Sequence, residues 1–162
     1  MRIPGLCLLV LAALAPAAAA EDLAAAHQAV RDADLGMAKA VAAGDADGFR
    51  AWLDDGAVFL GGASILNGPD QIAAGWKRFL DPEDPLSLAW EPTRVWLAAS
   101  GELAATAGDY TLHYPGADGA LATQTGRAGA REGRGTVLTL WIQGNGGWIA
   151  AAEAATPLRP AD

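Results

Sequence analysis

The spacing of apolar residues changes from a helical to a strand pattern about half-way along the 162-residue chain, and this change constrains the fold most. Helical spacing and cap signals predict helices over residues 21–43, over 46–53 and from Asn67 to about 79. Extended patterns predict strands over 57–60, 64–66, 88–99, 103–114, 136–143 and 148–155. We therefore expect an α+β protein with three N-terminal helices packed on a curved antiparallel sheet.

The first twenty residues resemble a secretory signal peptide. Arg2 precedes a short apolar run over residues 3–14, and three small residues end at Ala20, directly before Glu21. The run is shorter than the ~20 residues that span a bilayer, so cleavage after Ala20 is favoured over a membrane anchor. We expect a periplasmic or secreted protein, with residues 21–162 as a single domain.

Charge and composition argue against several classes of partner. The formal net charge is −8, and it becomes −9 without Arg2, which disfavours nucleic acids and anionic membranes. Cys7 leaves with the predicted signal peptide, and only His27 and His113 remain as strong metal ligands. We therefore expect no metal and no cofactor. Three arginines lie in the Gly-rich segment 115–135, where solvated side chains are more typical than an anion site: Arg127, Arg131 and Arg134.

The last two predicted strands form a hairpin whose register can be worked out. Asn145-Gly146 favours a two-residue turn, so the positions of paired residues sum to 291. The resulting aliphatic face consists of three pairs: Ile142 with Ile149, Leu140 with Ala151, and Leu138 with Glu153. Trp141 and Trp148 fall on the opposite face, where we expect them to form a homodimer interface.

Four segments carry a resemblance to a known superfamily: residues 43–48, 52–58, 67–74, and the final hairpin 139–157. Their order and spacing resemble the nuclear-transport-factor-2-like superfamily, which includes ketosteroid isomerases and SnoaL-type cyclases. Within it, the chain is most similar to the uncharacterised bacterial group related to the calmodulin-kinase association domain. The resemblance implies a cone-shaped α+β barrel around an apolar pocket, and homodimers that pack sheet against sheet.

The catalytic positions of ketosteroid isomerases can be carried over to this sequence by counting from those segments. The isomerase tyrosine falls on Met37, the base on Leu60 and the second hydrogen-bond donor on Leu138, and none of these can exchange a proton. The resemblance instead implies an apolar pocket wall, formed by Met37, Trp52, Leu60, Trp76, Leu138 and Ala151.

Glu153 is the most informative polar residue, because the predicted register places it alone on the aliphatic face. A carboxyl group there would act as a general base or anchor a ligand's amine or hydroxyl. Alternatively, it forms a structural salt bridge with Arg94, Arg127 or Arg134. Asp109 and His113 share one strand face and are further candidates for proton transfer, although a solvated stripe is more typical. Asp34 lies near the Val30–Met37 stripe of the first helix and could face the pocket, although a solvated flank is more typical.

Three functions are compatible with these observations. The first is a periplasmic or secreted protein that binds a small apolar molecule, with Glu153 fixing its orientation. The second is an isomerase, dehydratase or hydrolase that uses Glu153 with Asp109 or His113. The third is a dimeric interaction module whose interior is filled by its own side chains. A pocket at Glu153 would separate the first two from the third.

Overall fold

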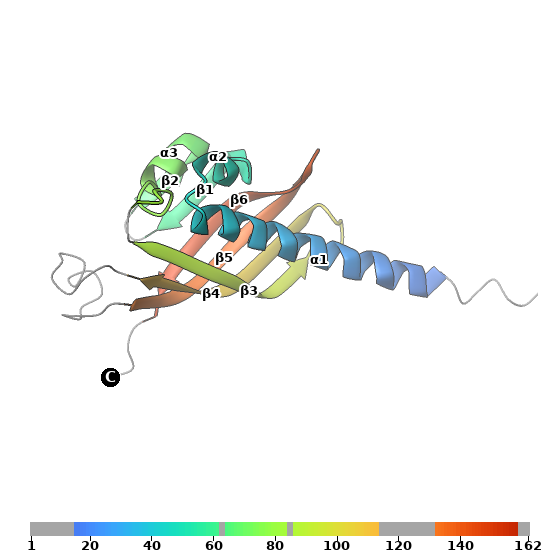
Figure 1. The fold of residues 1–162 in the computed structure, drawn as a ribbon. Coiled ribbons are helices and arrows are strands. Elements are labelled where there is room, and N and C mark those ends of the chain that lie inside the picture. Colours follow the sequence, from blue (N-terminus) through green and yellow to red (C-terminus); the bar gives the residue numbers. More distant parts are fainter. Residues whose placement is uncertain (1–14, 62–63, 84–85, 114–131, 159–162) are drawn as a thin grey trace, which may run out of the picture.

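The computed structural model describes residues 15–61, 64–83, 86–113 and 132–158 (Figure 1). Two helices come first, α1 (Ala15–Ala42) and α2 (Ala46–Arg50). Strands β1 (Leu53–Gly61) and β2 (Ser64–Asn67) then precede a third helix, α3 (Gly68–Gly75). The remaining strands are β3 (Ser87–Leu97), β4 (Leu103–His113), β5 (Glu132–Gly144) and β6 (Gly147–Pro157). No helix in the described ranges is long and apolar enough to cross a membrane.

The six strands form one mixed sheet in the order β2-β1-β6-β5-β4-β3. All neighbouring strands are antiparallel except β1 and β6, which run parallel. The prediction of a purely antiparallel sheet was wrong at this pair. No short turn connects β1 to β6, so nothing local in the sequence determines their relative direction.

The helices form where the capping residues predicted them. Gly44, at a φ of 66°, turns the chain out of α1, and the Asp45 side chain accepts a hydrogen bond from the Gly48 N–H at 2.8 Å. Pro69 occupies the first turn of α3. The second helix ends at Arg50, earlier than predicted, because Leu53 already pairs with Ala150 in the sheet.

The helix α1 lies across one face of the sheet, while α2, α3 and β2 lie together at the β1 side (Figure 1). Side chains on this inner face alternate with exposed ones along β5, as expected for a sheet covered on one side. Among the buried inner-face residues are Ala104, Thr106, Val137, Thr139, Trp141, Trp148 and Ala150. The outer face exposes large apolar side chains, among them Trp96, Leu138 and Leu140.

A β-bulge at Ala151 changes which side chains of β6 face inward. Trp141 pairs with Ala150, as the hairpin register predicts, but Leu140 pairs with Ala152 and Thr139 with Glu153. The extra residue shifts the pleat by one position, so Glu153 joins the face that carries Thr139 and Trp141. The predicted pairs Leu140–Ala151 and Leu138–Glu153 were therefore wrong, whereas Ile142–Ile149 is confirmed.

Candidate functional site

A cavity of about 170 Å³ lies on the inner side of the sheet, between the strands and the α3 region. Its walls are apolar and aromatic apart from one carboxyl group and one phenol. The lining residues are Phe59, Leu60, Gly61, Leu66, Trp76, Phe79, Leu88, Trp90, Tyr110, Leu112, Val137, Glu153 and Ala155. The described residues thus leave space inside the fold, whereas the interaction-module alternative expects an interior filled by its own side chains.

Aromatic rings make up much of the cavity wall. Trp76, just after α3, contacts the rings of Phe59 and Phe79 at centroid distances of 5.6 Å each. It also meets the Trp90 ring edge-on at 6.2 Å. Tyr110 completes this side of the cavity from β4, with its ring packed over Gly135 on the neighbouring strand. A β-carbon at position 135 would overlap that ring, so the glycine is needed for the ring's position.

Among the described residues, Glu153 is the only carboxylic residue that lines the cavity, and it is 4% exposed. Its Oε2 atom has no hydrogen-bond partner in the part of the chain that the structure describes. Burial, and to a smaller extent the nearby charge of Asp34, raise the pKa of Glu153 to about 8. The carboxyl group is therefore mostly protonated at neutral pH. The alternative of a structural salt bridge is not realised within the described residues, where Arg134 pairs instead with Glu132.

The second buried carboxyl group, Asp34, belongs to a closed hydrogen-bond network. One of its oxygens accepts from the Trp90 indole N–H at 2.6 Å, and the other accepts from the Thr106 hydroxyl. The Thr106 oxygen in turn accepts from the Trp141 indole N–H at 2.9 Å. Burial raises the pKa of Asp34, while these hydrogen bonds and the positive charge of Arg31 act to lower it.

The predicted pocket residues are only partly brought together. Trp76, Leu60 and Glu153 line the cavity, with Leu60 45% exposed. Met37 lies in the core, and half-buried Trp52 packs over Gly36 on α1; neither lines the cavity. Leu138, at 44% exposure, faces outward, and Ala151 is the bulged residue, so both were wrongly assigned to the wall.

Trp141 and Trp148 are core residues, not a dimer interface. Both rings are buried within the chain itself, and Trp141 donates a hydrogen bond to Thr106. The prediction was wrong because it took the aliphatic side of the hairpin as the inner face, whereas that side is the exposed one. A homodimer as such stays a prediction.

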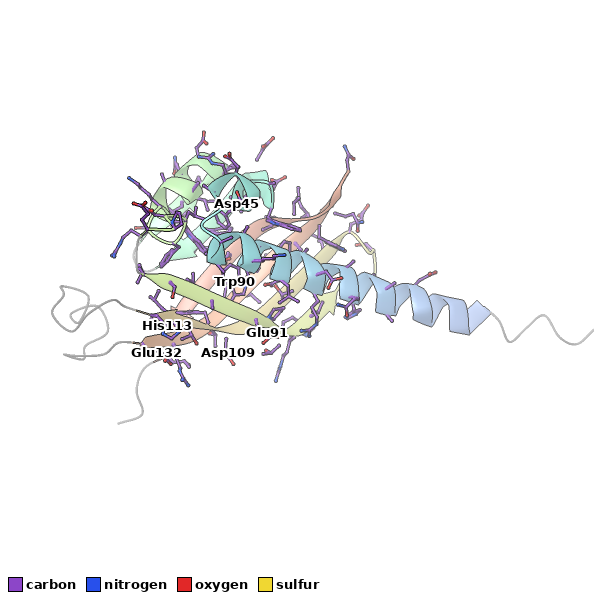
Figure 2. The ribbon with its side chains drawn as sticks, in the orientation of Figure 1. Asp45, Trp90, Glu91, Asp109, His113 and Glu132 are labelled. Atoms are coloured by element: carbon purple, nitrogen blue, oxygen red, sulfur yellow. The ribbon has the colours of Figure 1, made fainter. Side chains whose placement is uncertain are left out.

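Asp109 and His113 lie on the outer side of β4, away from the cavity. Both are exposed, and they alternate with the inward residues Gly108 and Tyr110. Figure 2 shows them at the lower edge of the sheet, whereas Trp90 lies beneath α1. Neither can therefore serve as an acid–base partner of Glu153. The segment that holds Arg127 and Arg131 lies outside the described residues.

For Asp34, a solvated flank was favoured over a position facing the pocket, but the side chain is 2% exposed. A signal was available: Val30, Asp34, Met37 and Val41 follow helical spacing, and the other three are core residues. Trp90, Thr106 and Tyr110 were missed. They become recognisable as site residues only once the inner face of each strand is known.

The SnoaL-like domain model matches residues 36–144 of the chain. The chain belongs to the SnoaL-like family. A search of the curated proteins finds no significant relative of this SnoaL-like chain.

Solved structures show that the SnoaL-like chain has the nuclear-transport-factor-2-like fold. A protein of that type from Novosphingobium aromaticivorans, with a cystatin-like fold, aligns with a TM-score of 0.70 at 14% identity, covering 94% of each chain. A ketosteroid isomerase-like protein from Erwinia carotovora atroseptica aligns at 0.61 with 19% identity, covering 83% of this chain and 97% of that one.

A structure described as a calcium/calmodulin-dependent protein kinase II association domain, from Xanthomonas campestris, is also similar. It aligns with a TM-score of 0.57 at 16% identity, covering 77% of this chain and 82% of that one. At these identities the structural comparisons establish the fold alone. The function has to be argued from the site.

Proposed function

We propose that the chain binds a small, largely apolar molecule in the cavity, with Glu153 as its polar anchor. One observation carries this proposal: an apolar, largely aromatic cavity contains a buried carboxyl oxygen that has no hydrogen-bond partner. An unpartnered buried polar atom destabilises a fold unless a bound group satisfies it. The volume of about 170 Å³ is close to the ~150 Å³ that accommodates one benzene ring, which suits a ligand of about one ring.

Hydrophobic contact would supply most of the affinity. Burying the roughly 200 Å² of one aromatic ring contributes about 5 kcal/mol, from which the cost of association is subtracted. The unpartnered carboxyl oxygen adds one hydrogen bond, which fixes the orientation of the bound ligand. The aromatic cluster around Trp76 gives this site a natural optical signal.

Filling the cavity tests the proposal. The substitution Ala155→Leu adds a large side chain to the cavity wall, whereas Ala154→Leu adds the same atoms to the outer face, beside Leu138. Tryptophan fluorescence should change when single-ring apolar molecules are added to the wild type and to Ala154→Leu, but not to Ala155→Leu. Equal responses in both variants, or no response in any protein, would refute binding in this cavity.

We also propose that residues 1–20 direct the chain to the periplasm or outside the cell. The short apolar run and the small residues before Glu21 support this. Expression of the full chain in a bacterial host should yield a periplasmic product whose N-terminal residue is Glu21. A cytoplasmic product that keeps Met1 would contradict the proposal.

A second candidate function is proton transfer by Glu153. It is favoured by one observation, the rise of the Glu153 pKa to about 8, which places the group near neutrality, where acid–base catalysts work best. A catalytic role predicts that Glu153→Gln abolishes turnover of a bound ligand while binding persists. Turnover at the wild-type rate in that variant would exclude the role.

A further inference from the structure

The chemistry of the cavity wall indicates which kind of polar group its ligand carries. We propose that the cavity takes an organic amine in its protonated form, attached to an apolar body of about one ring. This inference rests on the proposed function, because it concerns the ligand of the same cavity. It goes further by assigning that ligand a positive charge.

Two buried carboxyl groups, Glu153 and Asp34, favour a cation in the cavity. The Oε2 atom of Glu153 is buried at the cavity and lacks a donor, which an ammonium N–H would provide. Asp34 lies close enough for its charge to act on Glu153. Burial raises the pKa of Asp34, and the hydrogen bonds that both of its oxygens accept partly offset this rise. A ligand cation would favour ionisation of Glu153 and would be attracted by the charge of Asp34, whereas a neutral ligand would leave Glu153 protonated.

The aromatic rings of the cavity wall also favour a ligand cation. Five aromatic side chains line the cavity: Phe59, Trp76, Phe79, Trp90 and Tyr110. The faces of such rings carry negative charge and attract ligand cations, and tryptophan does so most strongly. Trp90 connects the rings to the carboxyl groups, because its ring lines the cavity while its indole N–H binds Asp34.

No positive charge of the described cavity wall competes with a ligand cation. No lysine, arginine or histidine is among the described residues that line the cavity. The ionisable groups near Glu153 in the described chain are Asp34 from α1 and the Tyr110 phenol from β4, while Arg31 acts on Asp34. No described cation therefore pairs with Glu153 in the cavity, and a ligand cation would do so.

Three probes of similar shape separate charge from hydrogen bonding and from apolar contact: 2-phenylethylamine, 2-phenylethanol and propylbenzene. Affinities would be measured at pH 7 by tryptophan fluorescence. We expect the amine to bind at least tenfold more tightly than the alcohol. In Glu153→Gln the affinity for the amine should fall at least tenfold, while that for propylbenzene changes less than twofold. Asp109→Asn removes an exposed carboxyl from the outer face and should leave all three affinities unchanged.

A second measurement needs no variant. When the amine binds at pH 7, Glu153 changes from mostly protonated to ionised, so most of one proton per complex should be released. Calorimetry in two buffers of different ionisation enthalpy measures this number. The alcohol should release none.

The outcomes distinguish the two proposals. Binding of propylbenzene and the alcohol with no preference for the amine, or no proton release with the amine, overturns the inference but leaves an apolar ligand site intact. An amine preference that survives in Glu153→Gln also overturns it. Failure of all three probes to bind overturns the inference and the proposed function together.

Discussion

Asp34 and Glu153 are both almost inaccessible to solvent, but their surroundings are opposite. Asp34 accepts hydrogen bonds from Trp90 and Thr106, and a further bond from Trp141 extends that network. Glu153 borders an empty volume, and its Oε2 atom has no partner. Among the described residues, the α1 side of the interior therefore has its polar groups satisfied, as a structural core requires. The β6 side keeps two unsatisfied ones, Glu153 Oε2 and the hydroxyl of its pairing partner Thr139.

The hydrogen-bonded surroundings of Asp34 therefore stabilise the fold, whereas the buried carboxyl group of Glu153 lowers its stability. A buried carboxyl group without a partner opposes folding, and proteins retain such groups at functional sites. The two regions nevertheless belong to one sheet, because Thr106 on β4 pairs directly with Thr139 on β5, and Thr139 pairs with Glu153. Three experiments test whether the contrast between them is real.

The largest expected effect is on the pH dependence of stability. The pKa of Glu153 rises from 4.5 to about 8 on folding, so the folded state holds this proton more tightly than the unfolded state. Its contribution is fully present below pH 4.5 and is lost as the pH rises towards 8, on the order of 3 to 5 kcal/mol. Urea unfolding of the wild type should show this decline.

The substitution Glu153→Gln should remove most of that decline between pH 5 and 8. A smaller slope of the same sign remains, because burial also raises the pKa of Asp34. Glu102→Gln removes an exposed carboxyl outside the sheet and controls for the loss of one charge. If the free energy of unfolding declines with pH as steeply in Glu153→Gln as in the wild type, burial of the Glu153 carboxyl group is not the cause of the decline.

Removal of the satisfied carboxyl group should lower stability at every pH. Asp34→Ala leaves the Trp90 indole N–H and the Thr106 hydroxyl without their acceptor, which costs about 3 kcal/mol. Asp32→Ala is the matched control, because Asp32 is an exposed residue of the same helix. Thermal and urea unfolding would measure both. A loss below 1 kcal/mol for Asp34→Ala would mean that the network contributes little.

The sequence predicts most helices and strands, because their signals are local. The α1 and α2 helices meet at Gly44-Asp45 as predicted, and the Asn145-Gly146 turn sets the first pairs of the last hairpin. The parallel pairing of β1 with β6 could not be predicted, since it joins segments almost a hundred residues apart. Its direction depends on how the whole sheet assembles.

The site was predicted in part and for an incorrect reason. Glu153 was expected to point inward, and it does, but the predicted register would have placed it on the outer face. Two errors cancelled: the aliphatic face is the exposed one, and the bulge at Ala151 moves Glu153 across the sheet. No pattern in the sequence indicates that bulge, because the neighbours Ala150, Ala151 and Ala152 are identical and carry no alternation.

The smallest and most direct test uses the two paired threonines, each 1% exposed. The Thr106 hydroxyl donates to Asp34 and accepts from Trp141, whereas the Thr139 hydroxyl has no partner. Thr106→Val should lower the free energy of unfolding by about 2 kcal/mol, and Thr139→Val should raise it by about 0.5 kcal/mol. Both substitutions replace a hydroxyl group by a methyl group at paired positions. The difference between their free energies of unfolding therefore reports the surroundings of each hydroxyl. Changes of the same sign would mean that the β6 side of the interior is as well satisfied as the α1 side, and the contrast between the regions would then be lost.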